Sequence, residues 1–421
     1  MRRRLSKNPD QPPSGAAAWL HERIDLGPLV ALAAKKTVPI HRHSWIYLLG
    51  GVALFLFGLQ VATGALLMLY YQPTETAAFR SVEEIVNDVP YGGLIRSMHA
   101  WGAHLFIAVV CLHLLTTLFT RAYRKPRELT WISGIVMLFV ALGFGFSGYL
   151  LPWTELSYNA TCAGTEAAAT VPGVGSLIAH FLRGGEHVTG ETITRFFAAH
   201  VLFLPLALGG ALLIHLGLIQ AQGMSLPLGM TEREVRDREP FFSEFLLTDG
   251  CVWLVLFGLI VTLAVFMPAP LGEEAELKPT PEGIKPEWYF LFMYQTLKLV
   301  PKSVGVPLLG LGVLFLLVLP FLDRSAARER KSIFFSVLFV VLVAYAAAFE
   351  LWALLTPGFE HEAAETAVDA TRAARSAVSL VLLWAVIVFL VVYLQKLRRE
   401  NARVRRLRAE ASGGMRATPP G

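Results

Sequence analysis

The sequence predicts an all-α, polytopic membrane protein with eight transmembrane helices, on the basis of composition, long apolar runs and the distribution of charge. Of the 421 residues, 54% are hydrophobic and 16% are charged, whereas ordinary soluble domains are about a quarter charged. Apolar runs of about 18–24 residues recur along the chain, long enough to cross a bilayer core as helices. We expect the spans at roughly residues 45–68, 98–119, 132–151, 197–219, 250–268, 305–322, 333–354 and 377–395.

The charged loops predict the orientation of these spans. Lys and Arg concentrate in both tails and in alternate loops, at residues 1–7, 120–131, 230–239, 323–331 and 396–408. The opposite loops are acidic or neutral, at residues 74–88, 267–283 and 359–370. Because basic loops stay in the cytoplasm, both termini are expected there, which requires an even number of spans. The net charge of +5 therefore indicates topology and lipid contact, and nucleic-acid binding is not expected.

Composition also divides the chain into segments. Residues 16–36 mix apolar and charged side chains and predict a surface amphipathic helix. The N-terminus lacks the apolar core of a cleavable signal, so we expect it to stay in the cytoplasm. The loop at 152–195 is expected to hold short helices on the outer face. The expected parts are a cytoplasmic tail with its surface helix at 1–44, a four-helix unit at 45–222, a cytoplasmic connection at 223–249, a second four-helix unit at 250–395 and a basic cytoplasmic tail at 396–421.

The cysteines indicate neither a disulfide framework nor a zinc site. Cys111, Cys162 and Cys251 are far apart and form no CxxC pair. The sequence also contains no CxxCH, the motif that ordinarily attaches haem c covalently. Any haem in this protein is therefore expected to be bound without a covalent link.

Four histidines occupy two of the predicted spans. His99 and His113 are 14 residues apart, which on a helix is about 21 Å of rise and within about 40° of one face. His200 and His215 are 15 residues apart, about 22 Å of rise and about 60° of rotation. Both spans run in the same direction, so the first member of each pair lies near the outer side and the second near the inner side. His104 lies about 140° round from His99 and is expected to have a structural role.

Two histidine pairs at two depths predict two haem b groups, one above the other. A neutral imidazole nitrogen is a good ligand for haem iron, and ligation removes the cost of burying the polar ring. The expected iron ligands are His99 and His200 for the outer haem, and His113 and His215 for the inner haem. For any single buried histidine, a hydrogen-bonded helix contact or a proton relay is the alternative.

Glycines and arginines support the same arrangement. Two glycine pairs in the first and third spans repeat the 14-residue spacing, namely Gly50 with Gly64, and Gly134 with Gly148. Glycine allows close approach to a bound plane, with helix packing as the alternative. Arg96, one turn before His99, is expected to neutralise a propionate of the outer haem, and Arg127 one of the inner haem. An ordinary interfacial arginine is the alternative.

A second candidate site lies between the fifth and sixth spans. Glu287 precedes a mostly apolar segment on the predicted outer side. A carboxylate at an apolar membrane edge suits proton acceptance from a bound hydroxyl. Trp288, Tyr289 and Tyr294 are aromatic neighbours able to line a slot for a flat ring. A helix-capping or interfacial glutamate is the alternative interpretation.

Together these residues resemble the cytochrome b family, the central subunit of quinol-oxidising cytochrome bc complexes. PEWYFLFMYQ at 286–295 is similar to the family's quinol-oxidation signature, and the four histidines match its haem ligands. GYLLPW at 148–153 and RKPRELTW at 124–131 match further family blocks, and the resemblance covers roughly residues 20–395. The histidine spacing and RKPRELTW look like chloroplast-type cytochrome b6, whereas eight spans in one chain look like the undivided respiratory type.

The resemblance implies an enzymatic role as a quinol–cytochrome c reductase with a bifurcated reaction. One electron from quinol passes to a Rieske iron–sulfur protein, and the other crosses the membrane through the two haems to an inner quinone site, with proton translocation. By this match Glu287 accepts a quinol proton, Tyr149 and Tyr294 line the outer pocket, and Asp249 serves protons to the inner quinone. It also implies a cytochrome c-type acceptor, a homodimer within a larger complex and a bacterial cytoplasmic membrane.

Three positions depart from the family pattern. Leu48 stands where the chloroplast type attaches an extra haem through cysteine, Gln220 replaces a basic residue, and Thr116 replaces another. An extra inner-side haem is therefore not expected. Two other interpretations of the whole chain stay open, a dihaem membrane anchor of another dehydrogenase or reductase, and a haem-free transporter with proton-relaying histidines.

Overall fold

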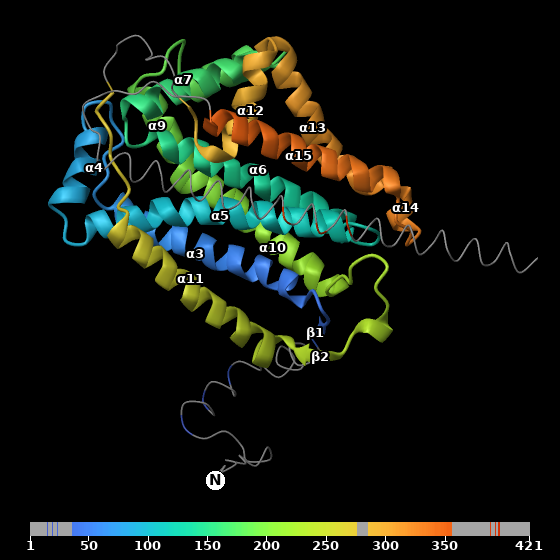
Figure 1. The fold of residues 1–421 in the computed structure, drawn as a ribbon. Helices are drawn as coiled ribbons and strands as arrows, with labels where there is room; N and C mark the ends of the chain where they lie inside the picture. The colour runs from blue at the N-terminus through green and yellow to red at the C-terminus, as the bar shows by residue number, and fades with distance from the viewer. Residues whose placement is uncertain are drawn as a thin grey trace, which may run out of the picture.

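The computed structural model describes residues 36–275 and 285–355, with a few isolated positions outside these ranges. The described chain is almost entirely helical, and Figure 1 shows its elements. They are β1 (Thr37–Ile40), η1 (Ser44–Tyr47), α3 (Leu48–Met68), α4 (Ala78–Asn87), α5 (Gly92–Thr120), α6 (Glu128–Leu150), α7 (Glu155–Ala169), α8 (Gly175–Arg183), α9 (Gly190–Ala198), η2 (Ala199–Phe203), α10 (Leu204–Gln222), η3 (Glu232–Glu234), β2 (Asp237–Pro240), η4 (Phe241–Phe245), α11 (Leu246–Phe266), α12 (Trp288–Leu299), α13 (Lys302–Leu322), α14 (Arg324–Ala327) and α15 (Ile333–Leu355).

Seven helical segments in the described part of the chain are long and apolar enough to cross a membrane. They are Ser44–Met68, Gly92–Thr120, Glu128–Leu150, Gly190–Gln222, Phe241–Phe266, Lys302–Ala327 and Ile333–Leu355. They correspond to the first seven predicted spans, several of them starting earlier than the apolar pattern suggested. Apart from a few isolated positions, the eighth predicted span at 377–395, the C-terminal tail at 396–421 and residues 1–35 of the N-terminal part lie outside the described residues.

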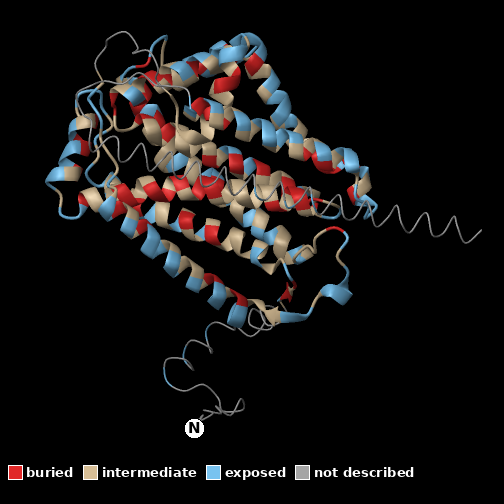
Figure 2. Cartoon of the chain, viewed as in Figure 1, coloured by how far each residue is buried: buried red, intermediate tan, exposed pale blue. Residues whose placement is uncertain are grey.

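Four of the long helices form the bundle that contains the histidines. Helix α3 packs along α5, α10 packs along α6, and α5 and α6 join the two pairs. Figure 2 shows buried residues concentrated along α5 and α6 and exposed ones along α11 and α15. Helix α11 lies against α3 and α5, whereas α12 packs against α15 and α13 contacts α6. The first four spans thus surround one interior, and the later helices lie on its outside.

Short helices cover one end of this bundle. Helix α4 lies at the left of Figure 1, α9 at the upper left and α7 along the top. Thr154 starts α7 with a capping box, in which its side chain accepts a hydrogen bond from the backbone of Ser157 and Ser157 bonds back. Thr189 makes the same arrangement at the start of α9. These caps explain why the 152–195 segment, expected to hold short helices, breaks into pieces rather than continuing as one span.

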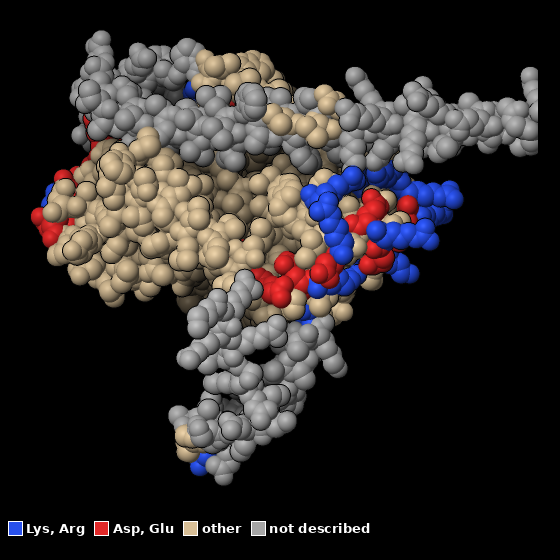
Figure 3. Space-filling model, turned by 60° about the horizontal axis from the view of Figure 1, so that its bottom comes forward, with Lys and Arg blue, Asp and Glu red and all other residues tan. Residues whose placement is uncertain are grey.

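The opposite end contains a small sheet that the sequence did not suggest. Strands β1 and β2 pair antiparallel, with Thr37 opposite Pro240 and Ile40 opposite Asp237. The pairing joins the segment before the first span to the connection before α11. Figure 3 shows Lys and Arg crowded at this end, interspersed with acidic residues, beside a wide belt without charge. Such a belt between charged ends is the pattern expected of a protein surrounded by lipid.

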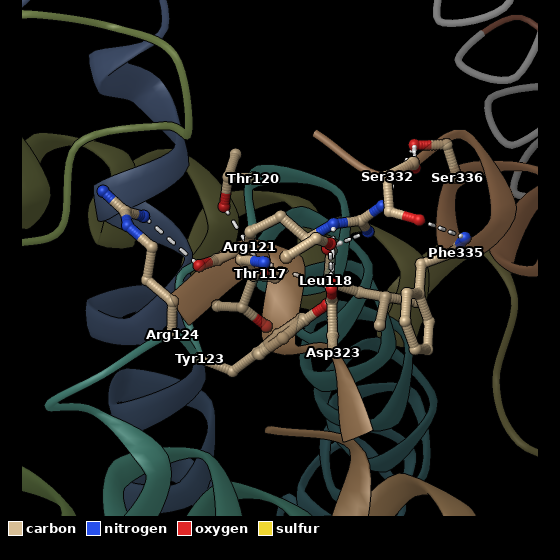
Figure 4. Close-up of polar contacts among 12 residues, drawn as sticks. Thr117, Leu118, Thr120, Arg121, Tyr123, Arg124, Asp323, Ser332, Phe335 and Ser336 are labelled. Carbon is tan, nitrogen blue, oxygen red and sulfur yellow. Dashed lines mark hydrogen bonds and ion pairs between the residues drawn. The ribbon is translucent and has the colours of Figure 1, made fainter. Parts of the chain in front are cut away.

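A buried polar cluster fastens the bundle to the later helices at the same end (Figure 4). Arg121, just after α5, lies with its Nε 3.4 Å from Oδ2 of Asp323, just after α13. Tyr123 donates its hydroxyl to Asp323 Oδ2 at 2.8 Å, and Arg121 Nη2 donates to Ser336 Oγ at 3.0 Å. The guanidinium also stacks 4.3 Å above the ring of Phe339 in α15. The cluster therefore connects α5, α13 and α15.

Candidate functional site

The four predicted ligand histidines face one another in two tiers inside the bundle. His99 and His113 lie on α5, His200 lies in η2 and His215 lies on α10. In one tier the ring centroids of His99 and His200 are 6.4 Å apart. In the other, His113 and His215 lie near enough to interact electrostatically. The pairing of His99 with His200 and of His113 with His215 is thus the one that the spacing predicted.

Each of the four predicted glycines lies against one of these imidazoles. The closest atom to a β-carbon built on each glycine is Cε1 of a histidine, at 3.8 Å for Gly50 and His113, 3.2 Å for Gly64 and His99, 3.4 Å for Gly134 and His215, and 2.6 Å for Gly148 and His200. A β-carbon at Gly148 or Gly64 would crowd the ring, whereas one at Gly50 or Gly134 would make an ordinary van der Waals contact with it. The 14-residue repeat of Gly50 and Gly64 therefore matches the 14-residue repeat of His113 and His99, whereas Gly134 and Gly148 face His215 and His200, which are 15 residues apart.

Hydroxyl groups hold three of the four imidazoles at Nδ1. Thr63 Oγ1 lies 2.9 Å from Nδ1 of His99, Ser133 Oγ lies 2.8 Å from Nδ1 of His215, and Ser147 Oγ lies 3.0 Å from Nδ1 of His200. Thr63 donates its own hydrogen to the carbonyl of Leu59 at 2.7 Å, and Ser133 donates to the carbonyl of Thr130 at 2.9 Å. With its hydrogen used in this way, the hydroxyl oxygen accepts from the ring.

This hydrogen bonding fixes the tautomer of the ring. When Nδ1–H donates to a hydroxyl oxygen, the lone pair of the neutral imidazole is on Nε2, the nitrogen that can bind a metal. His113 differs from the other three, because its buried Nδ1 has no hydrogen-bond partner among the described residues. The hydroxyl contacts of the other three rings therefore leave Nε2 as the nitrogen with the free lone pair.

The separation of the two imidazoles in the His99–His200 tier fits a haem held between them. Two imidazoles on one iron, each at a bond length of about 2 Å, place their ring centres roughly 6 Å apart, and His99 and His200 are at 6.4 Å. Glycine at the facing positions would allow the helix backbone to approach the plane of a bound haem closely. No group of three or more His, Cys, Asp or Glu residues in the described part of the chain suggests a different metal site.

A π-helical turn at η2 brings the second histidine pair into register. On an ideal helix the 15-residue spacing of His200 and His215 would rotate them by about 60°. The structure places His200 in the wide turn Ala199–Phe203, which takes up the extra residue. Pro205 follows Phe203 by two residues and lacks the N–H that would continue an ordinary hydrogen-bond ladder. Such turns are frequent at functional sites, and the sequence did not show this one.

Glu287 lies at the N-cap of α12, where the helix is fastened to the bundle. Its carbonyl accepts the backbone N–H of Phe290 at 2.9 Å, and its side chain is half-buried. The next residue, Trp288, donates its indole N–H to Nδ1 of His104 at 3.3 Å. His104 is buried on α5, so it has the structural role expected for it. Because His104 follows His99 by five residues, about 7.5 Å along the helix, Glu287 lies at the His99 end of the bundle.

The aromatic residues of the second site divide into two groups. The hydroxyl of Tyr289 lies 2.8 Å from a β-carbon built on Gly145, one turn before Tyr149 on α6. The start of α12, which Glu287 precedes, thus packs against the last turns of α6, the helix that contains Tyr149. Tyr294 lies further along α12, where Lys298 Nζ is 4.7 Å above its ring.

Asp249 is buried against the first helix of the bundle. Its residue is 2% exposed, and its Oδ1 has no hydrogen-bond partner among the described residues. A β-carbon on Gly51 would lie 1.6 Å from Asp249 Oδ2, so the carboxylate touches the α3 backbone beside Gly50. This places Asp249 near the tier of His113. A lysine lies near another position of interest: Lys36 donates to the backbone carbonyl of Gln220. Gln220 is the position at which this chain lacks the basic residue of the family pattern.

The two predicted propionate partners both make hydrogen bonds to backbone carbonyls. Arg96 donates to Ala269 at 2.7 Å and to Pro270 at 2.9 Å, in the segment after α11. Arg127, before α6, donates to Gln222 at 3.1 Å, and its Nε is buried without a partner among the described residues. Burial lowers the pKa of the Arg127 guanidinium, with the nearby Tyr47 acting in the opposite direction. An anion at this position would offset that cost.

Comparisons with known proteins agree with this geometry. The chain matches the family profiles described as "Cytochrome b/b6/petB" over residues 34–223 and "Cytochrome b(C-terminal)/b6/petD" over residues 274–368. It is 45% identical over 345 residues to the cytochrome bc complex cytochrome b subunit of Chlorobaculum thiosulfatiphilum, covering 80% of each chain. It is 44% identical over 211 residues to cytochrome b6 of Heliobacterium mobile, covering 50% of this chain and 99% of that one.

A solved structure shows the same fold. The structure titled "Hyperthermophilic respiratory Complex III" matches with a TM-score of 0.70 at 31% identity, covering 89% of this chain and 98% of that chain. Proteins of this family are integral membrane proteins that bind haem and take part in electron transport. The chain belongs to the cytochrome b/b6 family, as the cytochrome b subunit of a bc-type complex.

Proposed function

We propose that this subunit binds two haem b groups in tiers and carries electrons across the membrane between two quinone sites. The observation that carries the proposal is the matching of four glycines to four imidazoles, each glycine lying against one ring. His99 and His200 would hold the outer haem, and His113 and His215 the inner haem. When bound, the haems supply one-electron redox chemistry, and the protein supplies their placement and the tautomer of their ligands.

The outer quinone site is proposed at the contact between α6 and α12. Glu287 would accept a proton from bound quinol, since a half-buried carboxylate beside aromatic side chains is suited to general-base work. The bond between Trp288 and His104 supports this location, because it holds the segment at the His99 end of the bundle. Tyr149, from α6, would line the same site, with Tyr294 further along α12. One electron of each quinol would leave through a Rieske iron–sulfur partner toward a cytochrome c-type acceptor, completing a bifurcated quinol–cytochrome c reductase reaction.

The inner quinone site is proposed at the opposite end of the bundle. Asp249 is a buried carboxylate beside the tier of His113, and it would deliver protons to the inner quinone. Arg127 would neutralise a propionate of the inner haem, and Arg96, one turn before His99, would neutralise one of the outer haem. Proton release outside and uptake inside would make the cycle proton-translocating.

The orientation belongs to the same proposal. With an eighth span at 377–395, both termini would lie in the cytoplasm of a bacterium, and the subunit would sit in its cytoplasmic membrane as part of a homodimeric complex. The basic end in Figure 3 would then face the cytoplasm, as basic loops generally do.

Purification of the intact complex tests this proposal. The expected result is a Rieske protein among the subunits and two haem b per chain, with a reduced-minus-oxidised spectrum showing a b-type α-band. A dihaem protein that co-purifies with a dehydrogenase in place of a Rieske protein would support a membrane anchor. A preparation without the α-band would support a haem-free transporter.

A further inference from the structure

Three of the four haem-facing glycines are preceded in the sequence by a hydroxyl residue. The pairs are Thr63–Gly64, Ser133–Gly134 and Ser147–Gly148. In each pair the glycine lies against the ring of one histidine while the hydroxyl reaches Nδ1 of the same ring. The fourth pair is Leu49–Gly50, and the ring that it faces, His113, has a buried Nδ1 without a partner among the described residues.

This pattern makes the two tiers unequal. In the outer tier both imidazoles have a hydroxyl acceptor, Thr63 for His99 and Ser147 for His200. In the inner tier only His215 has one, Ser133. The difference follows from one position, because Leu49 lies 14 residues before Thr63 on α3, within about 40° of the same face.

Hydrogen bonding at Nδ1 changes the donor strength of the ligand. An Nδ1–H that donates to an oxygen makes the imidazole more basic at Nε2. A more basic ligand stabilises ferric iron relative to ferrous iron, so the reduction potential of the haem falls, and second-shell hydrogen bonding is a recognised means of setting that potential. The outer haem, with two such bonds, is therefore held at a lower potential than the inner haem, with one.

We infer that Thr63, Ser133 and Ser147 are positioning residues that set the reduction potentials of the two haems, and that Leu49 leaves the inner haem the easier to reduce. This inference rests on the proposed dihaem function. In that function one electron would pass from the outer haem, which would be oxidised, to the inner haem, which would be reduced. The unequal hydroxyl bonding makes that transfer favourable in the inward direction.

Spectroelectrochemical titration of the purified complex measures both potentials. Thr63→Val and Ser147→Ala are each expected to raise the potential of the outer haem and to leave that of the inner haem unchanged. Ser133→Ala is expected to raise the inner potential alone. Thr116→Val is the matched control, since its hydroxyl bonds to the backbone carbonyl of His113 and not to its ring; it is expected to shift neither potential.

A gain of hydrogen bond tests the inference in the opposite direction. Leu49→Ser places a hydroxyl where the other three pairs have one, and the inner potential is expected to fall. Leu48→Ser is the control, because it lies about 100° round the helix. Unchanged potentials in the Thr63, Ser147 and Leu49 variants, with both haems retained, would overturn the inference but leave the dihaem proposal standing. Retention of both haems in His113→Ala would overturn the dihaem proposal itself.

Discussion

Arg121 and Asp323 form a buried ion pair between segments that are 202 positions apart in the chain, with side chains 3% and 0% exposed. Arg121 also has a φ of 58°, in the left-handed region that non-glycine residues seldom adopt. That conformation turns the chain at the end of α5 and directs the guanidinium toward Asp323 and Ser336 (Figure 4). The pair therefore fastens the histidine-containing bundle to the later helices.

Removal of one partner is expected to be strongly destabilising. Asp323→Ala leaves the Arg121 guanidinium buried without its counter-ion and should lower the free energy of unfolding by about 3–5 kcal/mol. Denaturant unfolding in detergent measures the loss. The control is Glu166→Ala, which removes a half-exposed pair with Lys302 at 3.2 Å and should cost about 1 kcal/mol or less. Equal losses of unfolding free energy in the two variants would show that the buried pair stabilises the protein no more than the exposed pair does.

Gly148 gives the sharpest test of the glycine–imidazole contacts. Gly148→Ala builds a β-carbon 2.6 Å from Cε1 of His200, a distance at which the ring must move. The outer haem content should fall while the inner haem persists, as measured by the intensity of the two α-bands. Gly210→Ala, on α10, is the control because nothing lies within 4 Å of its built β-carbon. A full haem complement in Gly148→Ala would contradict the tight contact.

Glu287→Gln should slow quinol oxidation without loss of haem. The amide keeps the shape of the side chain but cannot accept the proton, and general-base contributions are typically about 100-fold or more. Steady-state quinol–cytochrome c turnover measures the effect, with haem content recorded in parallel. Glu191→Gln, in the exposed part of α9, is the matched control. Unaltered turnover in Glu287→Gln would remove this carboxylate from the mechanism.

His104 should matter to the same reaction through Trp288. His104→Leu removes the acceptor of the half-buried indole N–H of Trp288, which should reduce quinol turnover while both haems remain. His104→Asn offers an oxygen acceptor and should restore part of the activity. Equal turnover in the two variants would show that the hydrogen bond does not position the segment that contains Glu287.

The regular parts of this architecture could be predicted because they follow from helix geometry. The 14-residue repeats of His99/His113 and of the glycines depend only on rise and rotation, and the structure joins them as expected. The order of the first seven spans follows equally from apolar length. These features are local, so a single sequence carries them.

The remaining features depend on contacts that no local pattern shows. The β1–β2 pairing joins segments about 200 positions apart, and the π-helical turn at His200 depends on how Pro205 interrupts the ladder. The burial of Asp249 against Gly51 likewise needs the packing of α11 on α3. The hydroxyl before three of the four glycines is different, because Thr63, Ser133 and Ser147 were visible in the sequence once the glycine repeat was known.

Haem content of the purified His113→Ala complex tests the central claim most directly. His113 is expected to bind the inner iron with His215, whereas His99 and His200 bind the outer iron independently. The account predicts that the variant retains one haem b per chain, with the spectrum and potential of the outer haem, against two in the unaltered protein. Two haems in the variant, or none in the unaltered protein, would contradict it.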